Sequence, residues 1–317
     1  MFQPNLHTVV WGGDRICGYK GLDMQQKNIG ESWEVSAVPT SKSIVSNGEL
    51  AGRDLVSVVD EAPDEILGKA VSEKYNGQLP LLVKFIDSAK PLSIQVHPND
   101  EMARREHGKS GKTEMWYVID AQPGSFLYAG FKQEITPEEY KRRIADGTIT
   151  DVLAKHEVKR GDVFYLPAGR VHAIGSGILL CEVQQSSDVT YRIYDYNRPG
   201  LDGKPRELHT ELAAKAIDYR VQSDYRTSYT ASGSGTSAIL DTPFFRIRLI
   251  ECGGKEERRL KDEDSFVILI VLSGECHLRC EESPMEVSLG KYSGCLIPAA
   301  IADFTLEGEA KILEAII

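Results

Sequence analysis

The sequence has no excess of positive charge, because its 37 lysines and arginines are outnumbered by 47 aspartates and glutamates, which gives a net charge of −10. A protein that neutralises a phosphate backbone or an anionic bilayer needs the opposite balance. We therefore expect no nucleic-acid partner and no binding to a membrane surface.

Long hydrophobic runs are also missing. The longest, from Phe266 to Leu272, is far shorter than the roughly 20 apolar residues that span a bilayer. The amino terminus (MFQPNLHTVVWGG) has neither the basic start nor the apolar core of a signal peptide. The expected location is the cytoplasm.

Cysteine is scarce, with six residues in a chain of 317, so the fold cannot depend on a disulfide framework. Only Cys276 and Cys280 are close enough to suggest a metal pair. They lie four residues apart in an alternating strand, and no second Cys or His pair completes a tetrahedral site. We interpret both as structural.

Short strands punctuated by Gly, Pro and Asn dominate what is present. This pattern predicts a mainly β protein, a barrel or sandwich with short helical decoration. The predicted strands are ESWEVSAV, PLLVKFID, LSIQVH, EMWYVIDA, SFLYAGF, DVFYLPA, ILLCEVQQ, VTYRIYDY, FFRIRLIE, SFVILIVLSG, CHLRCE and KILEAII.

Helical signals are fewer and depend on capping residues, proline and glycine. The predicted helices are one or two from Asp54 to Lys74 with a break near Pro63, one capped by Asn99 or Asp100 and ending near Gly108, and one opened by Thr136-Pro137 and ending near Gly147.

A small, polar, Gly/Ser-rich stretch from Thr227 to Ser237 predicts a linker, which divides the chain into residues 1–226 and 238–317. A weak internal echo crosses it, because GDVFYLPAG and GKYSGCLIPAA both place a turn glycine before an apolar strand that ends in Pro-Ala. No histidine follows Pro298 as His172 follows the first of these turns. We expect the second unit to be a degenerate, structural copy of the first.

Three polar side chains share one face of a predicted strand. Ser93, Gln95 and His97 alternate with apolar residues, so they project together toward the interior. Buried polar groups are costly unless they are paired or liganded. A metal ion or a bound sugar would satisfy them.

Two further segments add to this set. Lys112 and Glu114 share a face of the next strand, and the turn PAGR delivers His172 to the start of another. Two histidines, a carboxylate and an amide from separate strands suit Zn²⁺ or a similar divalent ion with open positions for substrate. Because a lone histidine is more often structural, this hypothesis rests on the combination. The other histidines are expected to be ordinary surface or packing residues: His7, His107, His156, His209 and His277.

The segment GDVFYLPAGRVHA resembles the second motif of the cupin superfamily. Together with PLSIQVHP, GKTEMWY and YRIYDYNRPG it resembles the type I mannose-6-phosphate isomerase family in its short bacterial form. The specific motifs extend from Trp11 to about Leu208. The resemblance implies a jelly-roll cupin barrel, a second cupin-like β domain, and an enzyme that interconverts mannose 6-phosphate and fructose 6-phosphate.

The resemblance also implies roles for individual residues. The family holds one metal ion, usually Zn²⁺, through residues that match Gln95, His97, Glu114 and His172. Its active-site arginine matches Arg192, and its substrate-binding positions match Lys112, Ser93 and Lys84. Many relatives have Asn-His-Lys-Pro where this chain has Asn-Arg-Pro, so either Arg198 takes the place of that lysine in substrate binding or the contact is lost.

Aldose–ketose interconversion proceeds through an enediol and needs oxyanion stabilisation, a base and a phosphate anchor. We expect Arg192 to stabilise the enediolate; the alternative is a structural salt bridge with Asp195 or Glu182. Glu114, a histidine and a metal-bound water are all candidates for the base.

Two other functions are considered. Two histidines and a glutamate also resemble the ligands of non-haem iron oxygenases, although Gln95, Lys112 and Arg192 suit a phosphorylated polyol better. A sugar-sensing binding module is the non-enzymatic alternative. For the isomerase, the expected partner is a small phosphosugar and the expected assembly is a monomer or a weak homodimer.

Overall fold

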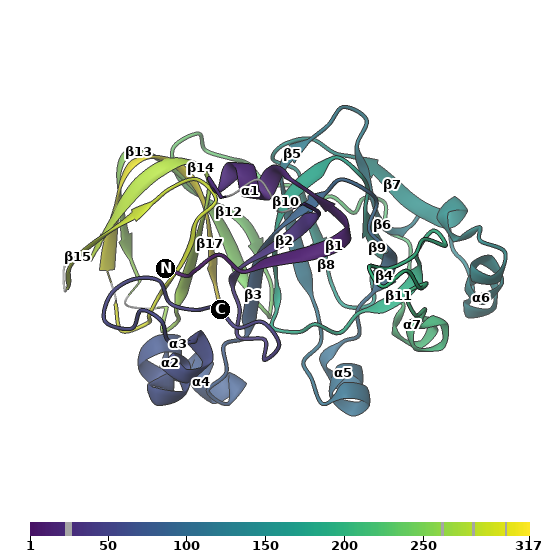
Figure 1. Ribbon diagram of the computed structural model, residues 1–317, viewed down its shortest axis with the longest axis horizontal. Coiled ribbons are helices and arrows are strands. Elements are labelled where there is room, and N and C mark those ends of the chain that lie inside the picture. Colours follow the sequence, from purple (N-terminus) through teal and green to yellow (C-terminus); the bar gives the residue numbers. More distant parts are fainter. Residues whose placement is uncertain (23–26, 261–262, 281–282, 302) are drawn as a thin grey trace.

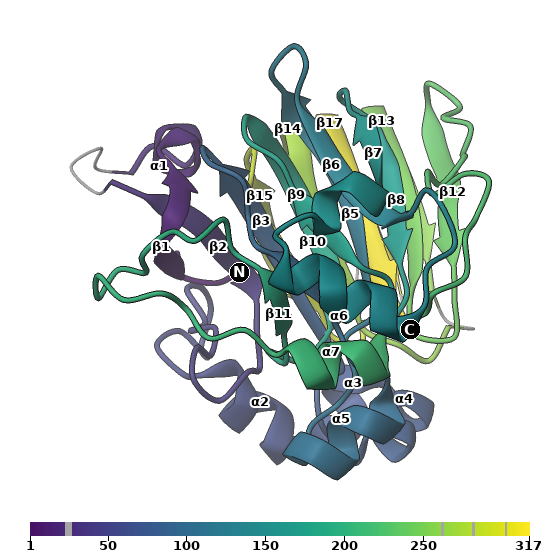
Figure 2. The ribbon, with the colours of Figure 1, turned by 90° about the vertical axis from the view of Figure 1, so that its right-hand side faces the viewer.

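The computed structural model describes residues 1–22, 27–260, 263–280, 283–301 and 303–317. Its strands form three sheets that are layered one against the next, with most of the helices at one edge and one end of the layers (Figures 1 and 2). This confirms the expectation of a mainly β chain with short helices. Within the described residues, no helix has the length and apolar character needed to cross a membrane.

The first sheet occupies the centre of the molecule and carries one wall of the candidate site. Its strands, in spatial order, are β1 (Leu6–Gly13), β2 (Ile29–Val35), β3 (Leu81–Ser88), β10 (Ile178–Gln185), β5 (Glu114–Ala121) and β8 (Val163–Leu166). Strands β3 and β10 are buried along their whole length because both faces of this sheet are covered.

The second sheet forms the opposite wall. Its strands, in spatial order, are β11 (Tyr191–Tyr194), β4 (Ile94–Val96), β9 (His172–Ile174), β6 (Phe126–Phe131) and β7 (Leu153–Glu157). Trp116 and Phe164 of the first sheet join one core cluster with Leu127 and Ile174 of the second, so the two sheets pack face to face. In the described part of the chain no strand pairing links them, so the predicted barrel is an open sandwich.

The third sheet contains long strands from the carboxyl-terminal unit. Its strands are β12 (Gly235–Asp241), β13 (Arg246–Arg259), β17 (Asp303–Ile316), β14 (Val267–Cys280) and β15 (Ser283–Leu289), with β16 (Gly294–Ile297) paired to β14. Strand β12 begins inside the predicted linker. The predicted strand CHLRCE is the end of β14, and its last residue, Glu281, lies outside the described residues.

Alternating side chains of β17 connect the third sheet to the first. Leu313 and Ala315 pack with Val83 of the central sheet, whereas Ile312 and Ile316 face the separate core of the carboxyl-terminal unit. The two units therefore share one continuous apolar layer. Cys276 belongs to the second of these cores, as its structural interpretation requires.

The helices lie outside the sheets. They are α1 (Arg15–Tyr19), α2 (Leu55–Glu61), α3 (Pro63–Leu67), α4 (Lys69–Tyr75), α5 (Asp100–His107), α6 (Pro137–Ala145), α7 (Thr210–Ala216) and the 3₁₀ helix η1 (Ile149–Val152). Asn99 caps α5 and Thr136 caps α6, and the side-chain oxygen of each accepts a backbone N–H, as the sequence predicted.

The segment from Asp54 to Lys74 contains three helices rather than one or two. Pro63 opens α3, and Gly68, with φ +90°, separates α3 from α4. The carboxylate of Asp264, from the carboxyl-terminal unit, then accepts the backbone N–H groups of Lys69 and Ala70. The second break was missed because this cap comes from a residue almost 200 positions away.

The shared apolar layer predicts strong coupling between the two units. Replacing the fully buried Leu313 with Ala should lower the free energy of unfolding by ~2–5 kcal/mol, because a cavity opens between the sheets. Urea denaturation measures this change. Leu201→Ala is the control, since that side chain is 65% exposed and its loss should cost less than about 0.5 kcal/mol. Equal effects of the two substitutions would contradict the packing described.

Candidate metal centre

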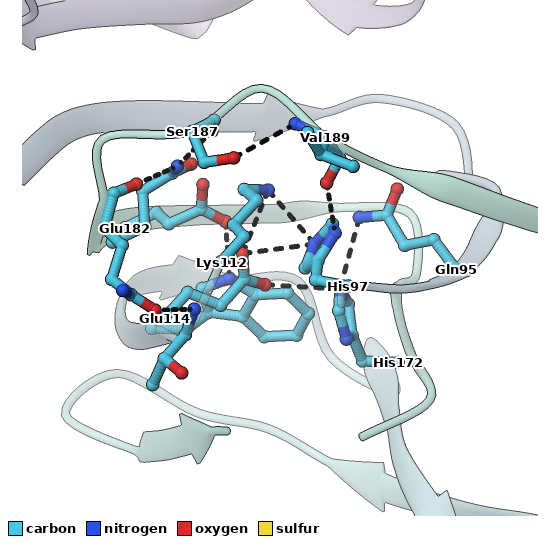
Figure 3. Close-up of polar contacts among 12 residues, drawn as sticks. Gln95, His97, Lys112, Glu114, His172, Glu182, Ser187 and Val189 are labelled. Atoms are coloured by element: carbon cyan, nitrogen blue, oxygen red, sulfur yellow. Dashed lines mark hydrogen bonds and ion pairs between the residues drawn. The ribbon is translucent and has the colours of Figure 1, made fainter. Parts of the chain in front are cut away.

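Three potential ligands converge between the two facing sheets, at the end where their strands begin or finish (Figure 3). His97 follows β4, His172 opens β9, and Glu114 opens β5 on the opposite sheet. Residue Gln95 of β4 pairs with His172 of β9, which sets the two imidazoles on the same face. Because the two sheets face each other, the carboxylate of Glu114 on β5 lies opposite these imidazoles.

The ligand atoms are close together. Nε2 of His97 lies 3.3 Å from Oε2 of Glu114, and Nε2 of His172 lies 3.2 Å from Oε1. In the described part of the chain these three residues are the one group of three or more His, Cys, Asp or Glu side chains whose ligand atoms all lie within 4.8 Å of one another. The predicted histidines and glutamate are thus brought together.

Backbone carbonyls fix both imidazole rings. Nδ1 of His97 donates to the carbonyl oxygen of Val189 at 3.0 Å, and Nδ1 of His172 donates to that of Arg170 at 2.8 Å. A carbonyl oxygen can only accept, so each ring carries its proton on Nδ1 and turns the lone pair of Nε2 toward Glu114. Metal-binding histidines are oriented by outer hydrogen bonds of this kind.

A tight turn after Pro167 joins the two histidines. The backbone N–H of Gly169 donates to the carbonyl oxygen of His97 at 2.9 Å. Gly169 has φ +90°, and a Cβ there would lie 3.0 Å from the carbonyl oxygen of Ala216. The Pro-Ala-Gly sequence therefore gives the left-handed turn that holds His172 beside His97.

Burial and neighbouring charges set the protonation of the group. Burial, followed by the charge of Lys112, lowers the pKa of His97 to about 3, and burial lowers the pKa of His172. Burial alone would raise the pKa of Glu114, but the charge of Lys112, the largest opposing cause, holds it well below its usual value. The site contains two neutral imidazoles and one carboxylate, which is the form that binds a metal ion.

The hydrogen-bond inventory also fits a metal ion. Both oxygens of Glu114 are buried and, among the described residues, none of their close contacts has hydrogen-bond geometry. A buried carboxylate without hydrogen bonds is costly. Two neutral nitrogens and such a carboxylate make a mixed donor set suited to a divalent ion with open coordination positions.

Gln95 reaches the edge of this group. Its amide nitrogen Nε2 lies 3.3 Å from Nε2 of His172, and rotation of the amide would present Oε1 there instead. Ser93 is buried and precedes β4 by one residue.

Two buried lysines lie beside the ligands. Nζ of Lys112 is 3.0 Å from Oε2 of Glu114 and 3.0 Å from Nε2 of His97. Nζ of Lys84 is 3.0 Å from Glu182 and 3.5 Å from Glu31, and these carboxylates outweigh the effect of burial and raise its pKa. Each lysine is thus an ion-pair partner of a buried carboxylate, Glu114 for Lys112 and Glu182 for Lys84.

The sequence reasoning missed the role of Glu182 and Trp116 in this wall. The two residues face each other across β10 and β5, and the indole N–H of Trp116 donates to Oε2 of Glu182 at 2.7 Å. The Trp116 ring also packs edge-on against His172, with centroids 5.3 Å apart. The available signal was a glutamate inside the apolar strand ILLCEVQQ, since a buried charge there needs a partner.

Arg192 stands on the edge strand next to the ligands, opposite Gln95 in the β11–β4 pairing. Its Nη1 donates to the carbonyl oxygen of Glu207 at 3.0 Å, while its Nε is buried and without a partner among the described residues. The alternative of a salt bridge with Asp195 or Glu182 is not observed in that part of the chain. Asp195 and Glu182 are bound by other cations.

Asp195 instead organises a cluster with two other arginines. Its Oδ1 accepts from Nε and Nη2 of Arg198 at 3.0 and 2.9 Å, and both its oxygens accept from Arg206 at 2.7 Å. Burial would raise the pKa of Asp195, but Arg206 and Arg198 lower it. Two guanidinium groups therefore bind one buried carboxylate, and Arg192 lies near enough for the charges of all three side chains to act on it. Arg206 was not singled out by the sequence motifs.

The comparisons extend the resemblance to the whole chain. The family described as phosphomannose isomerase type I, catalytic domain, matches residues 1–123, and the mannose-6-phosphate isomerase cupin domain matches residues 236–317. A mannose-6-phosphate isomerase of Streptococcus mutans is 33% identical over 98% of this chain and 96% of its own length. Mannose-6-phosphate isomerase ManA of Bacillus subtilis is 34% identical over the same shares.

Solved structures agree. The crystal structure of the mannose 6-phosphate isomerase from Bacillus subtilis matches with a TM-score of 0.90 and 30% identity, over 100% of this chain and 98% of that one. A putative mannosephosphate isomerase from Archaeoglobus fulgidus matches with a TM-score of 0.80 and 28% identity, over 99% and 95%. The fold and its buried His-Glu-His group define an enzyme of the cupin class. Within that class, the chain belongs to the type I mannose-6-phosphate isomerase family.

The arginine cluster gives a stability prediction. Asp195→Asn should lower the free energy of unfolding by ~3–5 kcal/mol, because Arg198 and Arg206, both mostly buried, would lose the buried carboxylate that they share. Thermal and urea denaturation measure the loss. Asp218→Asn is the matched control, since its partner Arg220 is 88% exposed and water replaces the lost contact. A similar loss in both variants would show that the cluster is not a stabilising unit.

Proposed function

We propose that this chain interconverts mannose 6-phosphate and fructose 6-phosphate through an enediol intermediate, with one Zn²⁺ held by Gln95, His97, Glu114 and His172. The observation that carries the proposal is the buried carboxylate of Glu114 facing two oriented, neutral imidazoles. Zinc is chosen because two nitrogens, a carboxylate oxygen and an amide oxygen match its usual catalytic donor set, although another divalent ion fits the same atoms. When bound, the ion would act as a Lewis acid on the substrate's oxygen atoms.

The chain's own groups support the rest of the chemistry. Arg192, which pairs with Gln95 across β11 and β4, has a buried Nε–H with no partner in the part of the chain that the structure describes, so this donor can share the negative charge of an enediolate. Ser93, which precedes β4, and Lys112, which lies beside Glu114, are proposed to bind sugar hydroxyls. Lys84 would act from β3, in the same sheet as Glu114, where it is paired with Glu182.

We place the phosphate at the arginine cluster. Lys84 and Lys112 are each paired with a buried carboxylate. At the edge strand, Arg198 and Arg206 share Asp195, and Arg192 makes no salt bridge among the described residues. The surplus of about two positive charges matches a phosphate monoester, which carries nearly two negative charges at neutral pH. Arg198 would then serve in place of the lysine found in many relatives.

The division of labour between the two units is part of the same proposal. Residues 1–226 would form the catalytic unit, 227–237 the connection and 238–317 a structural domain. The carboxyl-terminal unit packs against the first sheet from the side opposite the ligands, which supports a structural contribution.

The proposal predicts metal-dependent isomerisation. Purified protein should convert mannose 6-phosphate to fructose 6-phosphate, lose that activity on chelation and regain it when Zn²⁺ is added back. A coupled assay measures the conversion, and metal analysis should give about one ion per chain. Absence of turnover with metal bound would instead favour a sugar-binding module or an oxygenase.

Arg192 provides a sharper prediction. Arg192→Ala should lower kcat by about 100-fold or more, because a donor to the developing oxyanion is lost. Bound metal should stay at the wild-type level, since among the described residues the Arg192 side chain donates to the carbonyl oxygen of Glu207 and makes no hydrogen bond to His97 or His172. Steady-state kinetics and metal analysis separate the two effects. An unchanged kcat would remove Arg192 from the mechanism.

A further inference from the structure

Lys112 lies on two of the atoms that are assigned to the metal ion. Its Nζ is 3.0 Å from Nε2 of His97 and 3.0 Å from Oε2 of Glu114, and the lysine is only 5% exposed (Figure 3). The ammonium donates a hydrogen bond to Nε2 of His97 and forms an ion pair with Glu114. The two contacts have different consequences for metal binding.

The contact with His97 excludes coordination by the same nitrogen. The Nδ1–H of His97 is donated to the carbonyl oxygen of Val189, so Nε2 has one lone pair in the plane of the ring. That lone pair can accept an N–H from Lys112 or bind a metal ion, but not both. Oε2 of Glu114 has a second lone pair and can keep Lys112 while it binds the ion.

We infer that Lys112 and the divalent ion compete for Nε2 of His97, so that metal binding releases the Lys112 ammonium from His97 and frees it for the substrate. The inference rests on the metal site of the proposed function. Lys112 keeps its ion pair with Glu114 throughout, so the buried carboxylate always has a cation beside it. Metal binding therefore adds the N–H that His97 had accepted to the Lys112 donors that can face the sugar.

Lys84 offers a matched comparison. It is buried to a similar extent, at 7% exposed, and belongs to the same charged wall. Its ion-pair partners in the described residues are Glu31 and Glu182, which are not metal-ligand candidates. Removing either lysine takes one positive charge from the site, but only removal of Lys112 releases the lone pair of His97.

The test is the dissociation constant of Zn²⁺ in the wild type, Lys112→Met and Lys84→Met, measured at pH 8 by competition with a chromophoric chelator. Both variants should bind Zn²⁺ somewhat more tightly because a nearby positive charge is lost. Lys112→Met should gain at least about tenfold more than Lys84→Met, the size of effect that contacts to metal ligands have on affinity. Equal gains, or weaker binding in Lys112→Met, would overturn the inference.

Two further measurements separate folding and the proposed function from this result. Thermal denaturation checks each variant, and Lys112→Gln provides a second substitution that keeps a polar side chain but removes the charge; it should also gain affinity relative to Lys84→Met. If the wild type bound no Zn²⁺ at this site, the proposed metal centre itself would fail. If the wild type bound one Zn²⁺ and turned over substrate, but Lys112→Met and Lys84→Met had the same dissociation constant for Zn²⁺, the proposed function would stand and the inferred competition would be wrong.

Discussion

A fully buried carboxylate costs several kcal/mol of desolvation unless cations or hydrogen bonds stabilise it, and Glu114 is in this position between two sheets. Lys112 provides one cation, and the two imidazoles turn neutral nitrogens toward the Glu114 carboxylate. The arrangement of neighbouring residues follows from this need. Backbone carbonyls hold the rings with their lone pairs inward, and the left-handed turn at Gly169 keeps His172 within reach of His97.

The alternation of strand residues made much of this site predictable. Ser93, Gln95 and His97 share a face because side chains alternate, and Lys112 and Glu114 share another for the same reason. Local capping rules also predicted α5 and α6 from Asn99 and Thr136. Each of these features depends on residues within a few positions of one another.

Features that depend on distant residues were not predictable in the same way. The backbone and the ring of His209 both hydrogen-bond to the backbone of Arg192, which holds the segment before His209 along the edge strand. Arg206 belongs to this segment and so reaches Asp195. The break at Gly68 needs the carboxylate of Asp264 from the other unit. The open sandwich in place of a barrel depends on strand edges whose pairing the residue pattern does not encode. These contacts are set by tertiary packing, which periodicity alone does not determine.

The distribution of charge explains why the candidate site has two ends. At the ligand end, Lys84 and Lys112 are matched by Glu31, Glu114 and Glu182, so the protein alone carries a slight negative excess that attracts a cation. At the edge strand, Arg192, Arg198 and Arg206 exceed Asp195 and attract an anion. Mutual repulsion and burial lower the pKa of Arg192, a cost that a bound dianion would offset. A phosphosugar has a polarisable carbonyl at one end and a dianion at the other. One such molecule can therefore place its carbonyl at the ligand end of the site and its phosphate at the arginine end.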